Sequence, residues 1–193
     1  EMESQYNLEV KTCAKVKRVD LSSKEVVLGD DEKISYDKLV LATGSSAKTL
    51  GAMDDCTMSV NGIEDYERLL STLKNSKKVL VIGSGLVGVE FSHDLLTAGY
   101  DVSMFSLDKE PSSGLVPKEV GKVCKDHLIN MGMKWLFDKG IESMTKAESG
   151  VCVDFCTLGK KDFDVVLSAI GIVSRTELAE KMNCRVNKGI VTD

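Results

Sequence analysis

Three glycines with the spacing Gly-x-Gly-x-x-Gly stand between two segments of different hydrophobic periodicity. The motif comprises Gly83, Ser84, Gly85, Leu86, Val87 and Gly88. An apolar strand is predicted just before it over 78–82, and an amphipathic helix follows to about Ala98, with Gly99 as the C-cap residue. In this context the first glycine permits a tight turn, the second lets backbone approach a pyrophosphate, and the third allows close helix–strand packing. The motif therefore predicts a dinucleotide site at a helix N-terminus, the alternative being a glycine-rich turn that binds nothing.

The residue that ends the next strand bears on which dinucleotide would bind. The strand predicted over 101–105 leads to Ser106, with Asp108 and Lys109 just beyond. An acidic side chain at this place hydrogen-bonds the ribose 2′-hydroxyl of NADH and repels the 2′-phosphate of NADPH. Asp108 can supply that acid, Lys109 can instead favour a phosphate, and both can equally be solvated loop charges. Because no arginine follows the strand, the sequence favours NADH as the bound dinucleotide, and NADP stays possible.

Other titratable side chains lie on predicted helices. Glu90 falls two residues after Gly88, where the helix dipole alone favours a carboxylate. His93 and His127 are the only histidines, and packing or surface roles are expected for both.

The cysteine pattern indicates neither a disulfide framework nor a zinc site. Six cysteines stand at positions 13, 56, 124, 152, 156 and 184, with no Cys-x-x-Cys pair and no histidine at ligand spacing. Cys152 and Cys156 would share one face of a predicted strand, which leaves a metal or redox pair open, although small apolar filling is favoured. We therefore expect no bound metal and a reducing, cytoplasmic setting.

Composition narrows the class of protein. The chain has 193 residues, of which 42% are hydrophobic and 28% charged, and this excludes a disordered tail, a collagen-like fibre and a coiled-coil rod. The longest apolar runs have strand length, so no membrane-spanning helix is predicted. A net charge of −5 disfavours nucleic acid as a partner.

Two patterns divide the chain. In the first part, strands are predicted at 8–10, 15–20, 25–28, 33–35 and 39–42, and a linker at 47–61. In the second part, helices are predicted over 62–70, 86–98, 117–131 and 175–182, and strands over 78–82, 101–105, 135–137, 151–155, 163–170 and 189–192, with 163–170 apolar enough to be central. The alternation predicts an α/β fold, a Rossmann-like domain with a parallel sheet plus a β-meander.

Apolar residues at helical spacing predict the buried faces of two helices. The first face comprises Ile63, Tyr66, Leu69, Leu70 and Leu73. The second comprises Val120, Val123, Cys124, His127 and Leu128.

Three segments, in this order and at this separation, resemble successive signatures of the FAD-dependent pyridine nucleotide-disulfide oxidoreductase family. They are Tyr36–Ser45, Val79–Phe91 and Val166–Gly171, and the tail over 174–191 is most similar to the NADH:rubredoxin and NADH:flavorubredoxin reductases. The resemblance covers almost the whole chain. It implies an internal fragment of a longer protein, with an NAD(P)-binding domain over 53–172, part of an FAD-binding domain over 1–52, and a return segment over 173–193.

The resemblance also implies an activity and roles for particular residues. NADH would pass a hydride to FAD, which hands electrons to rubredoxin, flavorubredoxin or a similar small carrier. By position, Thr43 and Gly44 would lie near FAD, Glu90 would sit as the catalytic residue where nicotinamide meets flavin, and Gly171 would supply backbone close to the nicotinamide nucleotide.

Departures from the family pattern leave alternatives open. The glycine motif for FAD and a later Gly-Asp segment are not in these residues, and Val173-Ser174 stands where the family often has Arg-Pro. The missing Cys-x-x-Cys argues against a thioredoxin-reductase-like member. An NADH oxidase, a ferredoxin reductase, a bare nucleotide-binding module and a redox-sensing interaction protein stay open, and this chain alone is expected to be inactive.

Overall fold

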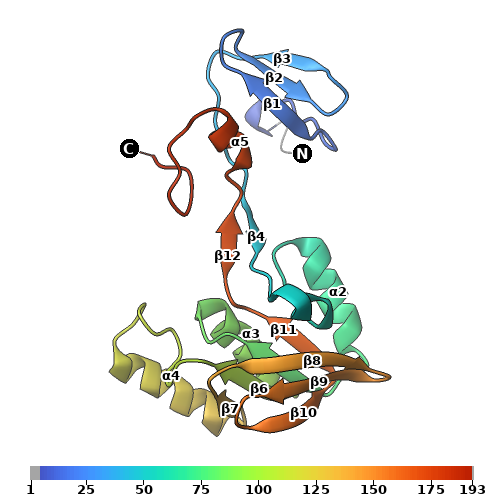
Figure 1. The fold of residues 1–193 in the computed structure, drawn as a ribbon, viewed down its shortest axis with the longest axis vertical. Coiled ribbons are helices and arrows are strands. Elements are labelled where there is room, and N and C mark those ends of the chain that lie inside the picture. The colour runs from blue at the N-terminus through green and yellow to red at the C-terminus, as the bar shows by residue number, and fades with distance from the viewer. Residues whose placement is uncertain (1–4, 193) are drawn as a thin grey trace. The chain divides into compact units, whose positions relative to one another are not determined.

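The computed structural model describes residues 5–192 (Figure 1), which form two compact units. The first unit combines the residues up to Ser45 with those from Val173 onward, and the second runs from Ser46 to Ile172. Strands β4 (Ser45–Ala47) and β12 (Ile172–Ser174) form a two-stranded sheet. The expected cofactor-domain boundaries at 52/53 and 172/173 stay predictions, since such domains are defined by what they bind.

A four-stranded parallel sheet forms the centre of the second unit. Its order is β11-β5-β6-β7, and every neighbouring pair is parallel. The strands are β5 (Lys78–Ile82), β6 (Asp101–Ser106), β7 (Lys134–Phe137) and β11 (Val165–Ser168). Helix α3 (Leu86–Thr97) links β5 to β6, and α4 (Lys118–Asn130) links β6 to β7. These helical crossovers between parallel neighbours confirm the predicted α/β fold class.

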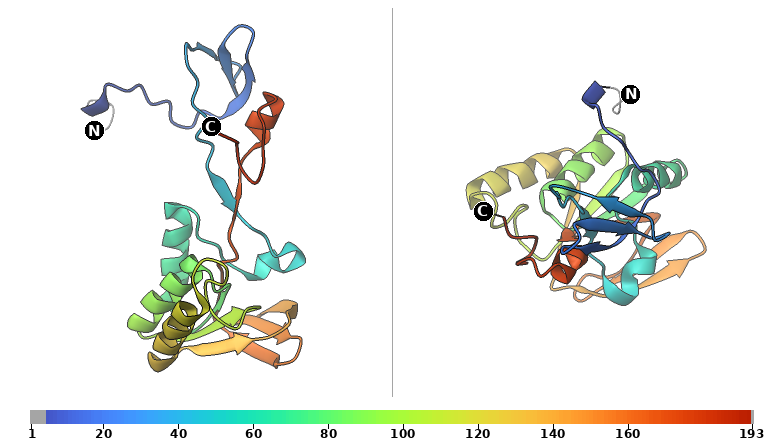
Figure 2. Two further views of the ribbon diagram at one scale, coloured as in Figure 1. Left: turned by 90° about the vertical axis from the view of Figure 1, so that its left-hand side faces the viewer. Right: turned by 90° about the horizontal axis from the view of Figure 1, so that it is seen from above.

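The two faces of the sheet are covered differently. Helices α3, α4 and α2 (Ile63–Leu73) lie on one side, and an antiparallel β-meander lies on the other (Figure 2). The meander has the order β10-β9-β8 and consists of β8 (Ile141–Ala147), β9 (Gly150–Phe155) and β10 (Gly159–Phe163). Along β5, Val79 and Val81 join the helix-side core, whereas Leu80 and Ile82 join the meander-side core. Burial on both faces explains why this strand is continuously apolar.

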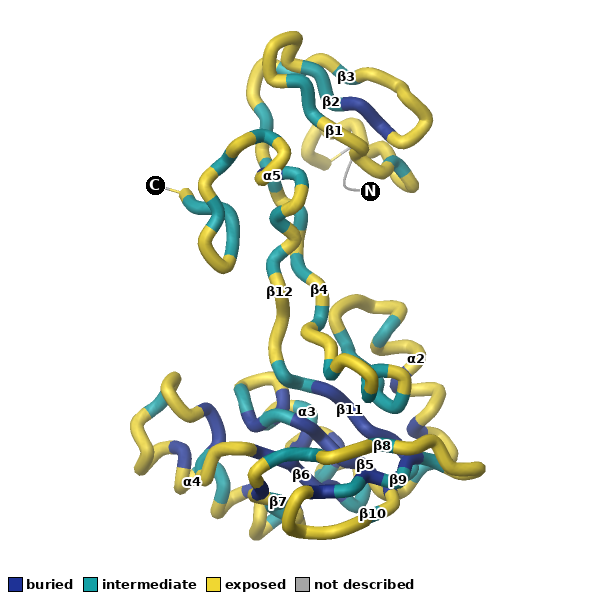
Figure 3. The backbone as a smooth tube through the Cα atoms, in the orientation of Figure 1, coloured by how far each residue is buried: buried dark blue, intermediate teal, exposed yellow. Residues whose placement is uncertain are grey.

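The first unit has a much smaller core. It contains a three-stranded antiparallel sheet of β1 (Val16–Asp20), β2 (Glu25–Leu28) and β3 (Lys33–Ser35), and the short helix α5 (Glu177–Lys181). Among its described hydrophobic residues, only Val27, Leu28 and Ala179 are buried (Figure 3). These strands follow the predicted ones closely, because each is bounded by an Asp, Ser or Gly turn.

Several predicted strands are wrong. Residues 8–10, 39–42 and 189–192 form no strand, and Val40 is 86% exposed. In the C-terminal segment, Ile190 forms an isolated bridge with Val186 and the N–H of Val191 donates to the carbonyl of Arg185, so the pairing is too short to make a strand. The segment 47–61 is not a plain linker, since it holds the 3₁₀ helix η1 (Gly51–Cys56) and a bridge from Met58 to Leu167.

The predicted strand over 163–170 is divided at Asp164. Its carboxylate accepts the N–H groups of Lys77 and Lys78 at 2.6 and 2.8 Å, and its own N–H donates to the carbonyl of Lys78. The chain therefore leaves the meander at this residue and enters the parallel sheet. β11 ends the strand order of that sheet, so the predicted central position is wrong.

Both predicted helix faces are only partly buried. On α2, Leu69 and Leu73 are buried, but Ile63, Tyr66 and Leu70 are exposed. On α4, Leu128 is buried and Cys124 partly so, whereas Val120, Val123 and His127 are exposed. Helical spacing shows which side of a helix faces the core, but the neighbouring elements determine how many residues on that side are buried. None of the helices in residues 5–192 is long and apolar enough to cross a membrane.

Candidate functional site

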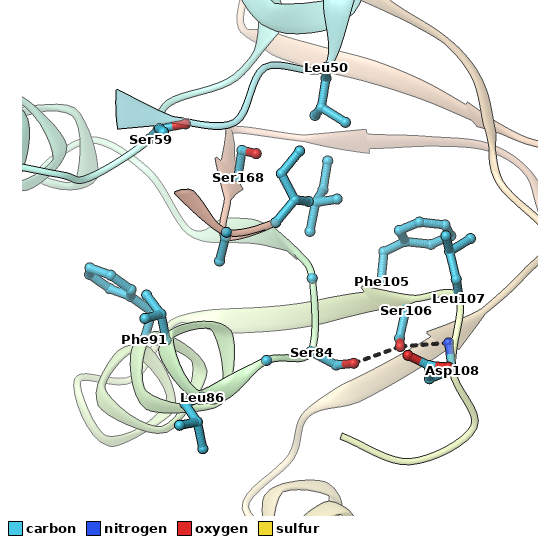
Figure 4. Close-up of a pocket in the computed structure, with 18 of the residues that line it drawn as sticks. Leu50, Ser59, Ser84, Leu86, Phe91, Phe105, Ser106, Leu107, Asp108 and Ser168 are labelled. Atoms are coloured by element: carbon cyan, nitrogen blue, oxygen red, sulfur yellow. Dashed lines mark hydrogen bonds between the residues drawn. The ribbon is translucent and has the colours of Figure 1, made fainter. Parts of the chain in front are cut away.

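A cavity of about 900 Å³ lies at the carboxyl ends of β5, β6 and β11, which is where parallel sheets bind ligands (Figure 4). All of its lining residues belong to the second unit. The predicted site residues that line it are Gly83, Ser84, Gly85, Leu86, Val87, Ser106, Asp108 and Gly171. The glycine turn, the end of β6 and the segment after β11 therefore meet around one space.

Two glycines of the turn are required by close packing. Gly83 has φ +103°, and a Cβ atom there would lie 2.6 Å from the carbonyl oxygen of Ala169. A Cβ at Gly88 would lie 2.0 Å from the carbonyl oxygen of Gly83. Both contacts are with backbone, which cannot swing aside. A side chain at Gly83 would push the turn away from the segment that follows β11, and a side chain at Gly88 would push α3 away from the end of β5.

Gly85 is required for a different reason. Apart from its two chain neighbours, no described residue lies within 4 Å of a Cβ atom built there, and its φ of −70° suits any L-residue. Neither packing nor backbone strain therefore explains this glycine. The open space above it belongs to the cavity, so the chain leaves room for a ligand to approach the backbone.

The N-terminus of α3 favours an anion at the same place. Gly85 is the N-cap residue and offers no side-chain hydrogen bond, so the first N–H groups of the helix are not capped in that way. The first turn contains no acidic residue. The partial positive charge of the helix end is thus left for a bound anionic group, as a pyrophosphate would supply.

A hydrogen-bonded chain joins the glycine turn to the end of β6. The hydroxyl oxygens of Ser84 and Ser106 lie 2.7 Å apart, and the oxygen of Ser106 accepts the N–H of Asp108 at 3.0 Å (Figure 4). Ser106 is only 3% exposed. Its hydroxyl therefore fixes the protein's own backbone, while Asp108 is an exposed carboxylate on the cavity wall.

The other predicted residues lie elsewhere. Glu90 is exposed on α3 and does not line the cavity, and neither does Gly88. Gly171 has φ +105°, and its carbonyl accepts the N–H of Lys48 at 3.0 Å. Thr43 and Gly44 belong to the first unit, where the Thr43 hydroxyl donates to the carbonyl of Arg175 and the Gly44 carbonyl accepts the Arg175 N–H. The flavin-facing roles of Thr43, Gly44 and Glu90 stay predictions.

Sequence reasoning missed further residues of the cavity wall. Ser168 ends β11, and its buried hydroxyl oxygen has no hydrogen-bond partner within the described residues. A polar residue at the carboxyl end of an apolar strand was the signal that could have found it. Lys139, Gly140 and Ile141 line the cavity from the start of the meander. No local pattern marks these three, because only the return of the meander onto the sheet brings them there.

The cysteines and histidines take no part in this cavity. All six cysteines are free thiols, and burial raises the pKa of Cys124. A hydrogen bond with Asp162 and burial raise the pKa of Cys152, which keeps its thiol protonated. His93 and His127 are exposed and stack at 6.2 Å between ring centroids. Across residues 5–192, no three His, Cys, Asp or Glu side chains gather so as to hold a metal ion.

A glycine turn between a parallel strand and a helix, beneath a cavity at the carboxyl edge of the sheet, defines a Rossmann-like dinucleotide-binding class of fold. Residues 2–193 match the family described as pyridine nucleotide-disulphide oxidoreductase, and the chain belongs to that family. Proteins of this family use FAD together with NAD(P)H. The predicted family and its cofactors are thereby confirmed.

Two named relatives match nearly all of this chain. Rubredoxin-NAD(+) reductase of Alcanivorax borkumensis is 32% identical over 193 residues, which are 98% of this chain and 50% of that protein. Nitric oxide reductase FlRd-NAD(+) reductase of Salmonella agona is 29% identical over 194 residues, with 100% of this chain and 51% of that protein covered. The chain spans about half the length of these curated relatives.

A solved structure supports the fold independently. A ferredoxin reductase from Rhodopseudomonas palustris superposes with a TM-score of 0.88 at 21% sequence identity, covering 99% of this chain and 48% of that one. At this level of identity the likeness concerns the fold.

Proposed function

We propose that the second unit binds NADH at the glycine turn, and that the whole protein is a flavin-dependent NADH reductase. Its electron acceptor would be rubredoxin, flavorubredoxin or a similar small carrier. Family membership supports the reaction class, and the names of the two curated relatives support the acceptor. Because the chain spans half of those relatives, turnover is proposed for the whole protein and not for these 193 residues alone.

The open space above Gly85 is the observation that carries this proposal. Gly83 and Gly88 are explained by contacts within the protein, but Gly85 is not. A pyrophosphate over Gly85 would meet the uncapped N-terminus of α3 and fill the part of the cavity nearest the turn. The residues present therefore fit a dinucleotide.

The remaining roles follow from position. When bound, the nicotinamide gives up a hydride and the flavin converts it into single electrons, which is chemistry that the protein does not supply. We propose that Asp108 hydrogen-bonds the ribose hydroxyls of the adenosine half. The backbone of Gly171 would contact the nicotinamide half. Glu90 would orient the nicotinamide ring or pair with a lysine, and Thr43 and Gly44 would lie near FAD.

NADH is the proposed substrate over NADPH. Asp108 is exposed at the cavity wall, and its negative charge would repel a 2′-phosphate. Lys109 is the competing group, since its cationic side chain would attract that phosphate. We place the site in the cytoplasm, where NADH is available.

Calorimetric titration of the chain with NADH and, separately, with NADPH tests this proposal. We expect binding of NADH in the micromolar range and much weaker binding of NADPH. Tighter binding of NADPH would mean that Lys109, by attracting the 2′-phosphate, decides the choice of nucleotide. No binding of either nucleotide to a folded chain would refute the dinucleotide site.

A non-enzymatic alternative is an isolated nucleotide-binding module. Only one Gly-x-Gly-x-x-Gly motif stands in the sequence, and this favours binding without flavin for these residues. We therefore expect a colourless preparation that binds NADH but does not oxidise it in a sustained manner when FAD is added. A yellow preparation, or sustained oxidation, would show that these residues hold flavin. An NADH oxidase or a ferredoxin reductase would be distinguished in the whole protein by oxygen consumption or by ferredoxin reduction.

A further inference from the structure

The segment 107–117 between β6 and α4, the β6–α4 loop, forms one wall of the cavity. Leu107, Asp108, Ser112, Ser113 and Leu115 of this loop line it. The N–H of Ser112 donates to the carbonyl of Ser84 at 2.7 Å, and Ser112 itself has the left-handed φ of +54°. The loop is therefore tied directly to the glycine turn, in a conformation that costs energy and needs support.

That support comes from Lys125 on α4, which does not line the cavity. Its ammonium group donates to the carbonyl of Lys109 at 2.6 Å and lies 3.8 Å from a carboxylate oxygen of Glu110. The same nitrogen lies 4.8 Å from the centre of the Trp135 ring, within cation–π range. One cation thus joins the loop, α4 and β7.

The loop depends on this cation because of where Glu110 lies. Its Oε2 atom is buried and has no hydrogen-bond partner within the described residues, and the ammonium of Lys125 forms an ion pair with it. Close backbone packing completes the contact, since a Cβ at Gly121 would lie 2.9 Å from the carbonyl of Pro111. Without the ammonium, the buried Oε2 atom would lose its ion-pair partner, which favours loop conformations that expose this oxygen to water.

We propose that Lys125 is a positioning residue for the nucleotide site: it holds the β6–α4 loop against α4, so that Asp108 and Ser112 stay beside the glycine turn. This inference rests on the proposed function, because it assumes that Asp108 meets the adenosine ribose. Lys125 touches no ligand. It acts on nucleotide affinity and on the choice between NADH and NADPH only through the loop.

Three variants test the proposal. Lys125→Met removes the charge and keeps an unbranched apolar side chain, whereas Lys125→Arg keeps a charge and hydrogen-bond donors. Lys122→Met removes an exposed charge from the same helix. Dissociation constants for NADH, NADPH and ADP-ribose would be measured by calorimetry. Hydrogen exchange would follow the loop and, as an internal reference, β5.

For Lys125→Met, we expect NADH and ADP-ribose to bind about tenfold more weakly, as for the loss of a hydrogen bond to a charged group. The preference for NADH over NADPH should narrow, and exchange should quicken in 107–116 but not in β5. Lys125→Arg should recover most of the affinity, and Lys122→Met should behave as the wild type.

Two results would overturn the positioning role. One is unchanged affinity and unchanged loop exchange in Lys125→Met. The other is an equal loss for NADH and NADPH with faster exchange in β5 as well, which would make Lys125 a general stabiliser. If the wild-type chain bound no nucleotide, the proposed function would fail, and loop exchange alone would still decide whether Lys125 holds the loop.

Discussion

At the scale of single residues, the three glycines of the turn have different structural roles, and single substitutions can test them separately. Gly85→Ala should leave folding intact, because φ at this position is −70° and the new Cβ would crowd none of the residues that the structure describes. The added methyl group should occupy the space for the pyrophosphate and weaken NADH binding by about tenfold or more. Calorimetry measures the affinity, and thermal unfolding should give the wild-type Tm. Unchanged NADH affinity would place the ligand elsewhere in the cavity.

Gly88→Ala is the matched control at the same turn. Its Cβ would lie 2.0 Å from a backbone oxygen, so α3 must shift. We expect a loss of about 3 kcal/mol or more in the free energy of unfolding, by analogy with overpacked cores. Chemical denaturation measures this loss. A wild-type stability for Gly88→Ala would contradict the tight packing of α3 on β5.

Asp108 is the residue on which the choice of nucleotide depends. Asp108→Asn removes the negative charge with little change in size, so NADH should bind about three- to tenfold more weakly while NADPH binds equally well or better. Calorimetry with both nucleotides gives the ratio. Lys109→Met serves as the control and should not favour NADPH. Equal weakening of both nucleotides by Asp108→Asn would remove Asp108 from the ribose site.

At the scale of elements, Asp138 joins the start of the meander to its second turn. Its carboxylate, on a residue only 5% exposed, accepts hydrogen bonds from Thr157, Lys139 and Leu158. Burial by itself raises the pKa of this carboxyl, but these hydrogen bonds outweigh burial and hold the pKa at about 2, below the ordinary value of 3.8. The charged form is therefore the one that stabilises the folded state.

This depressed pKa gives a pH dependence with a defined sign. The stabilisation by Asp138 should be complete above about pH 4 and be lost as the pH falls toward about 2. Asp138→Asn should lower the Tm at pH 7, and the gap between variant and wild type should close over that acid range. Thermal unfolding from pH 7 to pH 2 measures it. A gap that is constant with pH would mean that the charge of Asp138 does not stabilise the meander.

At the scale of the whole molecule, every lining residue of the cavity lies between Ser46 and Ile172. The second unit also contains both large cores. A chain of residues 46–172 should therefore fold by itself and bind NADH within about twofold of the affinity of the 193-residue chain. Circular dichroism checks folding, and calorimetry checks binding. A folded second unit without affinity would show that the first unit completes the site.

The sequence by itself determined the features that neighbouring residues encode. The turn at 83–88, the strands β5 and β6, the helix between them and the short strands β1 to β3 follow from local periodicity and from Gly, Asp and Ser positions. Ser106 and Asp108 could be placed near the turn because they end the next strand of the same unit. The resemblance to the family likewise rested on contiguous segments, over 36–45, 79–91 and 166–171.

Only the tertiary structure decided the features that depend on residues far apart in the chain. The pairing of β11 with β5 brings Ala169 against Gly83, and the return of the meander brings Ile141 to the cavity. The contact between Lys125 and Glu110 likewise spans a loop. The apolar segment over 39–42 has the pattern of a strand but does not form one. Such a pattern forms a strand only where another backbone pairs with it. Pairing, burial and charge neutralisation are properties of contacts, and no local pattern specifies them.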